Sequence, residues 1–265
     1  MSVTKTATLG FPRIGPNREL KKALESYWNG QLPEEALLET AASIEEGAWE
    51  AQAAAGEEGQ GHRADYNLYD QTLLYTESLG LVPDRFVSLP RGIDRMFQMA
   101  RGGDDRPALD MTKLFDTNYH YNVPELTASH EPAPDFSYLM AGLERGVTRL
   151  GGHRSAAVVL GPVTYLHLAK ADAPATRVSL LAKLVPVYRA LLADIAALSV
   201  AELQLHEPAL TAGADAASTA SLAGLFEAAY PAILDGLPRG LDINMVAYFG
   251  EDVGESNLYV VAAAP

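Results

Sequence analysis

The sequence has no cysteine among its 265 residues. A chain without cysteine forms no disulfide, binds no zinc through thiolates and has no cysteine nucleophile. Basic residues are also scarce: 20 Lys and Arg stand against 34 Asp and Glu, which gives a formal net charge of -14 at pH 7. Nucleic acids and anionic membranes require a broad basic surface, so we expect neither as a partner.

Long apolar runs are absent as well. No window approaches the roughly 18 apolar residues that would span a bilayer, and the opening MSVTKTATLG has no apolar core of signal-peptide length. We therefore expect a cytoplasmic protein. The six histidines show no metal-ligand spacing, so no metal site is predicted. The hydrophobic share of 48% is near the globular average and permits a sizeable core.

Strand-like and helix-like segments alternate along the chain. After a short predicted strand at Ala7–Ile14, four strands are expected at Met111–Phe115, Ala156–Leu160, Glu202–Leu205 and Ile243–Phe249. Such alternation predicts an α/β fold with a parallel sheet and right-handed crossovers, either a barrel or an open doubly wound sheet. We favour the barrel, because several motifs lie where strands meet the following loops.

The first helix is predicted by apolar residues spaced three and four apart after Gly15-Pro16-Asn17, with Asn17 as the N-cap. Three further helices are expected. One runs from Pro33 to about Ala55, one follows residues 65–70 and ends at about Leu79, and one lies around Ile93 to Ala100. The stretch from Ala209 to Leu225 is rich in small residues and is interpreted as a loop, rather than a linker, that leads into a helix through about Leu234.

One end of this acidic chain is locally positive. The first 22 residues contain the single acid Glu19 and five basic residues, Lys5, Arg13, Arg18, Lys21 and Lys22. Cations near a helix start can hold carboxylates through charge-assisted hydrogen bonds, helped by the helix dipole. Without further information, an ordinary solvated helix face explains the same pattern.

Several segments are similar to one known family. They are LGFPRIGPNRELKK at residues 9–22, continuing to Tyr27-Trp28, then residues 65–70, MTKLFDTNYHY at 111–121, and LGPVTY at 160–165. In this order they resemble the amino-terminal part of the cobalamin-independent methionine synthases, which are built from two (β/α)8 barrels. The resemblance implies that residues 1–265 form a single amino-terminal TIM-like barrel domain, incomplete with about six of eight strands. The carboxy-terminal zinc and homocysteine barrel would be absent.

The resemblance also assigns a substrate site. It implies that Arg18, Glu19, Leu20 and Lys21 contact 5-methyltetrahydropteroyl-polyglutamate, with Lys113 as a second contact. Lys113 could instead pair with Asp110 or Asp116. The run Asp116, Asn118, Tyr119, His120 and Glu125 fits either a binding loop or a brace between barrels, and His120 within it is interpreted as a hydrogen-bonded structural residue.

Three further features have a structural, an unassigned or a minor alternative interpretation. Gly161-Pro162 is interpreted as a turn, because no P-loop lysine accompanies it. His206 has no assigned role. Glu207 could act as an acid or base with a second carboxylate, a minor alternative.

The whole enzyme implied by this resemblance transfers a methyl group from the folate to homocysteine and so makes methionine. The chain alone is predicted to lack turnover and to hold no cofactor, with zinc expected in the missing domain. Its partners would be the folate and the missing barrel. The alternative is a non-catalytic module that binds folyl-polyglutamate and has lost the catalytic barrel.

Overall fold

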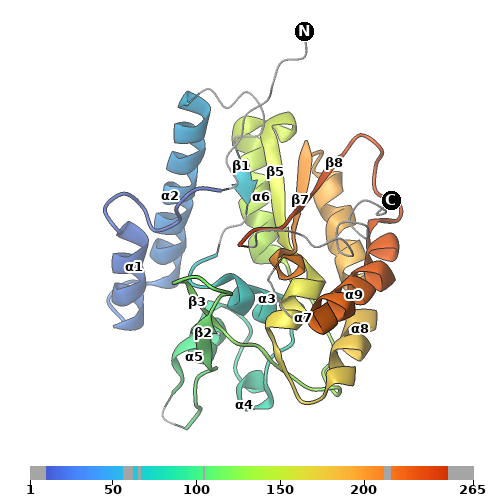
Figure 1. Ribbon diagram of the computed structural model, residues 1–265. Coiled ribbons are helices and arrows are strands. Elements are labelled where there is room, and N and C mark those ends of the chain that lie inside the picture. The colour runs from blue at the N-terminus through green and yellow to red at the C-terminus, as the bar shows by residue number, and fades with distance from the viewer. Residues whose placement is uncertain (1–9, 56–61, 65–66, 104, 212–215, 250–265) are drawn as a thin grey trace.

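A four-stranded parallel sheet forms the centre of the protein (Figure 1). The computed structural model describes residues 10–55, 62–64, 67–103, 105–211 and 216–249. The strands are β1 (His62–Ala64), β5 (Ser155–Leu160), β7 (Glu202–His206) and β8 (Asp242–Val246), and they lie side by side in that order. The prediction of an α/β fold with parallel strands is therefore confirmed.

The strand order rises along the chain without reversal. Helices α6 (Ser137–Leu150), α8 (Pro174–Ala197) and α9 (Ala216–Leu234) precede β5, β7 and β8 respectively. Right-handed crossovers that always step in the same direction place their helices on one face of a sheet. The register agrees, since Ala157 lies beside Leu203 and Val159 beside Leu205, and all four pack into the core with these helices.

The expected barrel is not confirmed, because the strands in the described ranges form no closed barrel. One predicted strand lies outside the parallel sheet: β2 (Met111–Lys113) pairs antiparallel with β3 (His120–Asn122). The turn between them is tight, with the Leu114 N–H donating to the Tyr119 carbonyl. A parallel return needs a crossover of a dozen or more residues, which this turn does not provide.

Other strand boundaries also differ from prediction. Strand β8 ends at Val246 rather than at Phe249, whose φ of 69° takes the backbone out of the extended region. Residues 10–14 form a loop that ends in a turn at residues 13 and 14 instead of a strand, and the first three residues of that prediction lie outside the described ranges. Two short segments, β4 (Glu125–Leu126) and β6 (Lys170–Ala171), form a separate parallel pair.

A second layer of helices packs around its own core. It comprises α1 (Glu19–Trp28), α2 (Glu34–Ala54), α3 (Gln71–Leu79), α4 (Asp84–Val87) and α5 (Ile93–Arg101). Leu20, Leu37, Leu73 and Phe86 are fully buried there. Helix α2 runs beside α6, to which the buried Glu45 is joined by Arg145 at 2.6 Å. The four predicted helices in this part are confirmed to within a few residues.

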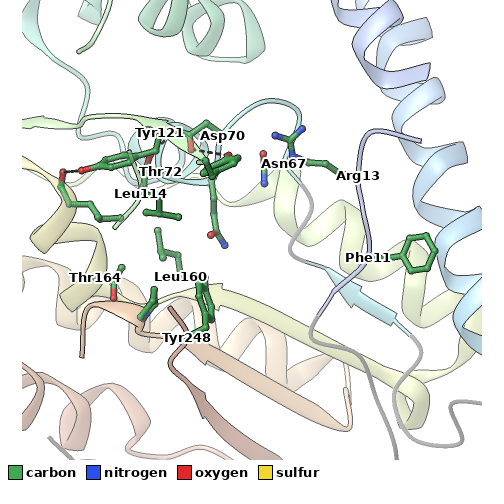
Figure 2. A pocket seen from close by; sticks show the side chains of 14 residues that line it. Phe11, Arg13, Asn67, Asp70, Thr72, Leu114, Tyr121, Leu160, Thr164 and Tyr248 are labelled. Carbon is green, nitrogen blue, oxygen red and sulfur yellow. Dashed lines mark hydrogen bonds between the residues drawn. The ribbon is translucent and has the colours of Figure 1, made fainter. Parts of the chain in front are cut away.

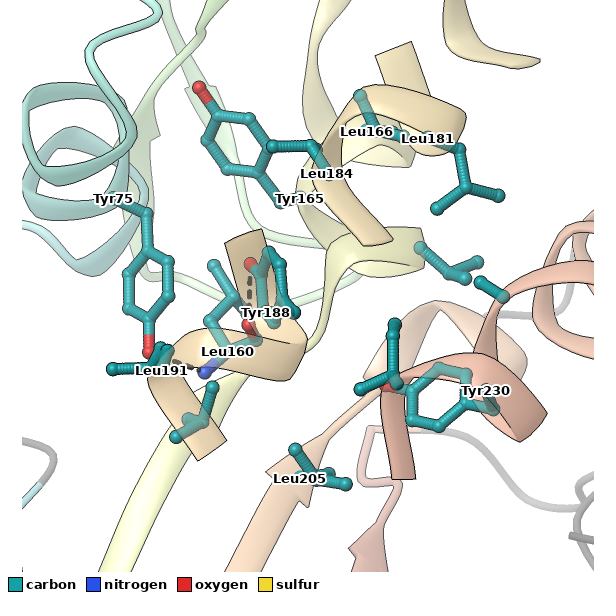
Figure 3. Close-up of a cluster of buried hydrophobic side chains, with 14 of the residues drawn as sticks. Tyr75, Leu160, Tyr165, Leu166, Leu181, Leu184, Tyr188, Leu191, Leu205 and Tyr230 are labelled. Carbon is teal, nitrogen blue, oxygen red and sulfur yellow. Dashed lines mark hydrogen bonds between the residues drawn. The ribbon is translucent and has the colours of Figure 1, made fainter. Parts of the chain in front are cut away.

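The main core is unusual in burying several tyrosines, Tyr75, Tyr165, Tyr188 and Tyr230 (Figure 3). Their hydroxyls find partners, as buried phenols must. At the end of β5 the Leu160 N–H donates to Tyr75 Oη, and Tyr188 Oη donates to the Leu160 carbonyl, each at 2.9 Å. Two side chains from α3 and α8 thereby fix the last residue of a central strand.

No helix within the described residues is both long and apolar enough to cross a membrane.

Candidate functional site

A hollow of about 250 Å³ lies at the carboxyl ends of the parallel strands (Figure 2). Four of its lining residues come from these ends: Asn67 after β1, Leu160 at the end of β5, Pro208 after β7 and Tyr248 after β8. In sheets of parallel strands joined by helices, ligands bind outside this edge. The hollow is therefore the first candidate for a small-molecule site.

Asp70 provides a buried carboxylate in its wall. Asp70 is the N-cap of α3, and its Oδ2 accepts the Leu73 N–H at 3.1 Å. The same oxygen accepts Thr72 Oγ1 at 2.6 Å and the Asn122 N–H at 3.1 Å. Burial raises the pKa of Asp70 above its usual value, against the opposing effect of these donors. Asp70 thus joins α3 to the hairpin while facing the hollow.

Arg13 and Tyr119 lie beside this carboxylate. Arg13 Nη2 donates to the Tyr69 carbonyl at 2.6 Å, and Tyr119 Oη donates to Asp70 Oδ1 at 3.4 Å. Burial raises the pKa of Tyr119, the charge of Asp70 raises it further, and Arg13 opposes the rise. The Tyr119 hydroxyl therefore lies within the electrostatic reach of both charged groups.

The opposite wall of the hollow is more apolar. Leu160 lines it, together with Thr164 at the start of α7 (Pro162–Leu168), and Leu114 and Leu168 add further apolar lining to the hollow. Figure 2 places Leu160, Thr164 and Tyr248 across from the polar heads of Arg13, Asn67 and Asp70. A ligand in the hollow would meet charge on one side and hydrocarbon on the other.

His206, which the sequence left without a role, belongs to a row of polar side chains on one face of β7. Its Nδ1 lies 3.4 Å from Tyr248 Oη, and its Nε2 lies 3.3 Å from Gln204 Oε1. Gln204 in turn donates to Glu202 at 2.6 Å. His206 is buried, and it positions the Tyr248 ring at the edge of the hollow.

Glu207 is a buried structural carboxylate. It is fully buried and accepts the Val163 N–H at 3.1 Å, the Thr164 N–H at 2.6 Å and Tyr230 Oη at 2.6 Å. It thus satisfies the free N–H groups at the start of α7. Burial raises its pKa to about 7. This geometry fits helix capping rather than the alternative acid/base role.

The turn predicted at Gly161-Pro162 is not found, because Gly161 is the extended N-cap of α7 and Pro162 is the first residue of that helix. A Cβ on Gly161 would overlap the carboxylate of Glu207. Position 161 therefore needs glycine because of Glu207, which is distant in sequence.

The four residues predicted to contact the folate differ in exposure. Arg18 is exposed at the N-cap of α1 with a left-handed φ of 62°, and Lys21 is exposed one turn later, 3.5 Å from Glu25. Leu20 is fully buried in the helical core. Two of the four side chains are thus available at the surface as cations.

Glu19 braces the turn before α1. Its Oε2 accepts the Asn17 N–H at 2.9 Å, and its Oε1 accepts the Asn17 side-chain amide at 3.0 Å. Hydrogen bonds from its own backbone N–H and then from Asn17 lower the pKa of Glu19. The prediction of Asn17 as the N-cap is therefore wrong. The helix begins at Glu19, and Asn17 donates to the Glu19 carboxylate instead of capping the helix.

Lys113 is exposed on β2, opposite His120 in the hairpin register. Lys113 forms an ion pair with neither Asp110 nor Asp116, all three lying within the described ranges, and Asp110 lies 3.4 Å from Lys170. Arg18, Lys21 and Lys113 do not line the hollow, whereas their chain neighbours Arg13 and Leu114 do. The predicted cations therefore lie on the surface outside it.

The polar run after β2 divides in the structure. His120 Nδ1 lies 3.1 Å from the Asn118 carbonyl within its own turn, in agreement with a structural role. Glu125 accepts both terminal nitrogens of Arg85, at 2.6 and 2.8 Å, and so braces α4 within this domain. Tyr119 alone of the run lines the hollow.

The sequence interpretation did not identify Arg13, Asn67 and Asp70 as members of one site. Arg13 was noted for its charge, and Asn67 and Asp70 lay inside a segment that resembled the family. The hydrogen bond from Arg13 to the Tyr69 carbonyl joins the first of these residues to the segment before α3. Among the residues that the structure describes, no three His, Asp or Glu side chains lie close enough to hold a metal ion.

Comparison with known proteins places this architecture in a family. The model described as the N-terminal domain of cobalamin-independent synthase matches residues 5–264. A 5-methyltetrahydropteroyltriglutamate–homocysteine methyltransferase from Trichodesmium erythraeum is 40% identical over 261 residues, covering 98% of this chain and 33% of the relative. The protein of the same name from a Synechococcus strain is 42% identical, covering 97% of this chain and 32% of the relative. The chain thus spans about a third of the length of these curated relatives.

Proposed function

Since this chain belongs to the cobalamin-independent synthase family, whose N-terminal domain it matches, we propose that it supplies the folate side of a methionine synthase. The relatives are named for a methyl transfer between 5-methyltetrahydropteroyltriglutamate and homocysteine. In the proposal, this chain binds the negatively charged glutamate tail, and the rest of the enzyme brings homocysteine and zinc. The chain by itself holds the substrate without turning it over.

Exposed cations at the start of α1 are the main support for this role. The chain has a net charge of -14, so an anionic tail is repelled by most of the molecule. Arg18 and Lys21 are exposed on the first turn of α1, where the helix dipole also favours a carboxylate. Lys113 provides a third exposed cation on β2.

The nearby acid does not cancel this local charge through a direct ion pair with Arg18. Glu19 is turned back onto Asn17, which donates two hydrogen bonds to it. Arg18 also projects from a backbone conformation that costs about 1–2 kcal/mol for a residue other than glycine. Glycine would be free of that strain, but it would provide no cation at the helix start.

The proposal includes the architecture of the missing part. A parallel sheet with rising strand order and with its helices on one face has the pattern of an arc of a (β/α)8 barrel. We propose that residues 1–265 form one such domain and that the carboxy-terminal barrel of the full-length enzyme packs against it.

Binding of a folyl-triglutamate to the 265-residue chain tests the tail-binding role. Calorimetry should show that 5-methyltetrahydropteroyl-triglutamate binds at least about tenfold more tightly than the monoglutamate, because charge-assisted hydrogen bonds contribute about 1.5–3 kcal/mol each. The Arg18→Ala/Lys21→Ala double variant should lose most of this preference, and Lys113→Ala should lose part of it.

Lys22→Ala is the matched control, because Lys22 is an exposed lysine of the same helix that the proposal does not use. It should bind the triglutamate as the parent does, apart from a small long-range electrostatic effect. Equal affinity for the two folates, or an equal loss in Lys22→Ala, would refute the assignment of Arg18 and Lys21.

A further inference from the structure

The hollow at the strand ends contains a buried acceptor that lacks a donor. Asn67 is 9% exposed, and its Oδ1 is buried without a hydrogen-bond partner. A buried acceptor without a donor is unfavourable, and a ligand that supplies the donor removes this cost. Of the described residues with such an atom, Asn67 is the one that lines the hollow, so a ligand there would lie beside its side chain.

Opposite charges line the same side of the hollow. Arg13 is half-buried, and its Nη2 donates to the Tyr69 carbonyl. Its other guanidinium N–H groups can therefore donate to a second acceptor. Asp70 Oδ1 receives the Tyr119 hydroxyl at the long distance of 3.4 Å. Arg13 and Asp70, both within the described ranges, form no ion pair with each other, so each can meet an opposite charge of a ligand.

The size and the other wall restrict the ligand further. A volume of about 250 Å³ is below the range of about 300–1,000 Å³ that is typical of sites for drug-sized molecules. Leu114, Leu160 and Leu168 supply hydrocarbon to the lining, and Leu160 lies across from the charged side (Figure 2). A small ligand with two opposite charges at one end and an apolar group at the other fits all of these features.

We propose that this hollow binds a free α-amino acid with an apolar side chain. The carboxylate of the ligand meets Arg13, its ammonium group donates to Asn67 Oδ1 and Asp70 Oδ1, and its side chain packs on the leucines. The site is separate from the proposed tail-binding cations, which do not line the hollow. It holds a net neutral zwitterion, whereas those cations attract a polyanion.

Calorimetry or ligand-observed NMR with L-leucine and the 265-residue chain tests the proposal. L-Leucine should bind saturably, and L-leucinamide and N-acetyl-L-leucine, which lack the carboxylate and the ammonium charge, should each bind at least about tenfold more weakly. L-Glutamate should bind more weakly than L-leucine, because its side-chain carboxylate would face the leucines. These comparisons do not depend on whether any variant folds.

Two variants locate the site. Asn67→Leu should abolish leucine binding while leaving the protein at least as stable to urea, because it removes a buried side-chain oxygen that has no donor. Arg13→Met should weaken binding of L-leucine far more than binding of L-leucinamide. Arg189→Met is the matched control, since Arg189 forms an exposed pair with Asp235 away from the hollow. The Arg18→Ala/Lys21→Ala variant should bind leucine as the parent does, so this proposal and the folate proposal can fail separately.

Absence of saturable L-leucine binding up to about 10 mM, a concentration that corresponds to less than about 3 kcal/mol of binding free energy, overturns the proposal. The proposal is also overturned if L-leucinamide and N-acetyl-L-leucine bind as tightly as L-leucine, or if Asn67→Leu binds L-leucine as the parent does.

Discussion

The buried carboxylate of Glu207 should make the stability of this protein depend on pH. Burial raises the pKa of Glu207 from 4.5 to about 7, although two N–H groups of α7 and the Tyr230 hydroxyl stabilise its charged form. Between pH 4.5 and about 7, Glu207 therefore keeps its proton in the folded state but has lost it in the unfolded state. The resulting stabilisation is fully present below pH 4.5 and is lost as pH rises through about 7.

The size of the effect follows from the pKa difference. At about 1.4 kcal/mol per pKa unit, the change from 4.5 to about 7 corresponds to about 3 kcal/mol of unfolding free energy. Glu207→Gln removes the titration. Because glutamine has only one side-chain acceptor for three donors, the variant should also lose about 1–3 kcal/mol independently of pH.

Urea unfolding of the parent and of Glu207→Gln, measured between about pH 4.5 and pH 8, gives the required comparison. The unfolding free energy of the parent minus that of the variant should fall by about 3 kcal/mol from the lower to the higher pH, so that the variant becomes at least as stable as the parent near pH 8. Glu227→Gln, which removes an exposed carboxylate from α9, is the control and should show no such change. A difference that stays constant with pH would refute the argument that Glu207 is protonated in the folded state near neutrality.

Two other substitutions test the packing. Gly161→Ala should destabilise the protein by about 1–3 kcal/mol through the overlap of its Cβ with Glu207, and the loss measured by urea unfolding should be smaller in a Glu207→Ala background. A cost that is unchanged in that background would rule out this contact as the cause. Glu77→Ala should cost about 3–5 kcal/mol, because Glu77 accepts two nitrogens of the buried Arg95 and the Gly92 N–H; Lys170→Ala, in the exposed pair with Asp110, should change the urea midpoint little. Similar losses in both would contradict the role of burial.

Much of the secondary structure could be predicted from periodicity. The strand Ser155–Leu160 lies in a short run of apolar residues, and Glu202–His206 alternates polar with apolar residues on its two faces. Met111–Lys113 has the same local character, but its place in the sheet depends on the tight turn between Leu114 and Tyr119. Strand propensity does not distinguish a hairpin from a member of the central sheet.

The start of α1 shows a similar limit. Asn17 is a good N-cap by residue type, yet the backbone of Arg18 takes a left-handed conformation and Glu19 accepts from Asn17. The competing hydrogen bonds within this turn, and the absence of room for a side chain at Gly15 beside Glu19, determine where the helix begins. Sequence spacing identified the helix face correctly, but the local pairing of Asn17 and Glu19 shifted its first residue.

The candidate sites differ in how far sequence alone could reach them. Arg18 and Lys21 are close in sequence and project from one helix, so their charge was visible as a cluster. Arg13, Asn67 and Asp70 come from a turn and from the segment before α3, and Asn67 has no signal of its own because an asparagine in a loop is ordinary. Only the burial of its Oδ1 without a donor distinguishes it.

The two proposed sites also illustrate how an acidic protein can bind ligands that contain carboxylates. At α1 the repulsion is reduced locally, because Glu19 is held by Asn17 while Arg18 and Lys21 face solvent. In the hollow, Asp70 accepts hydrogen bonds from three donors, and burial raises its pKa. When Asp70 is protonated at low pH, it repels an incoming carboxylate less. When it is ionised at higher pH, it can bind an ammonium group. In both places a carboxylate accepts hydrogen bonds from backbone N–H groups and, within the described ranges, forms no ion pair with the nearby arginine, Arg18 or Arg13, which is thereby left for the ligand.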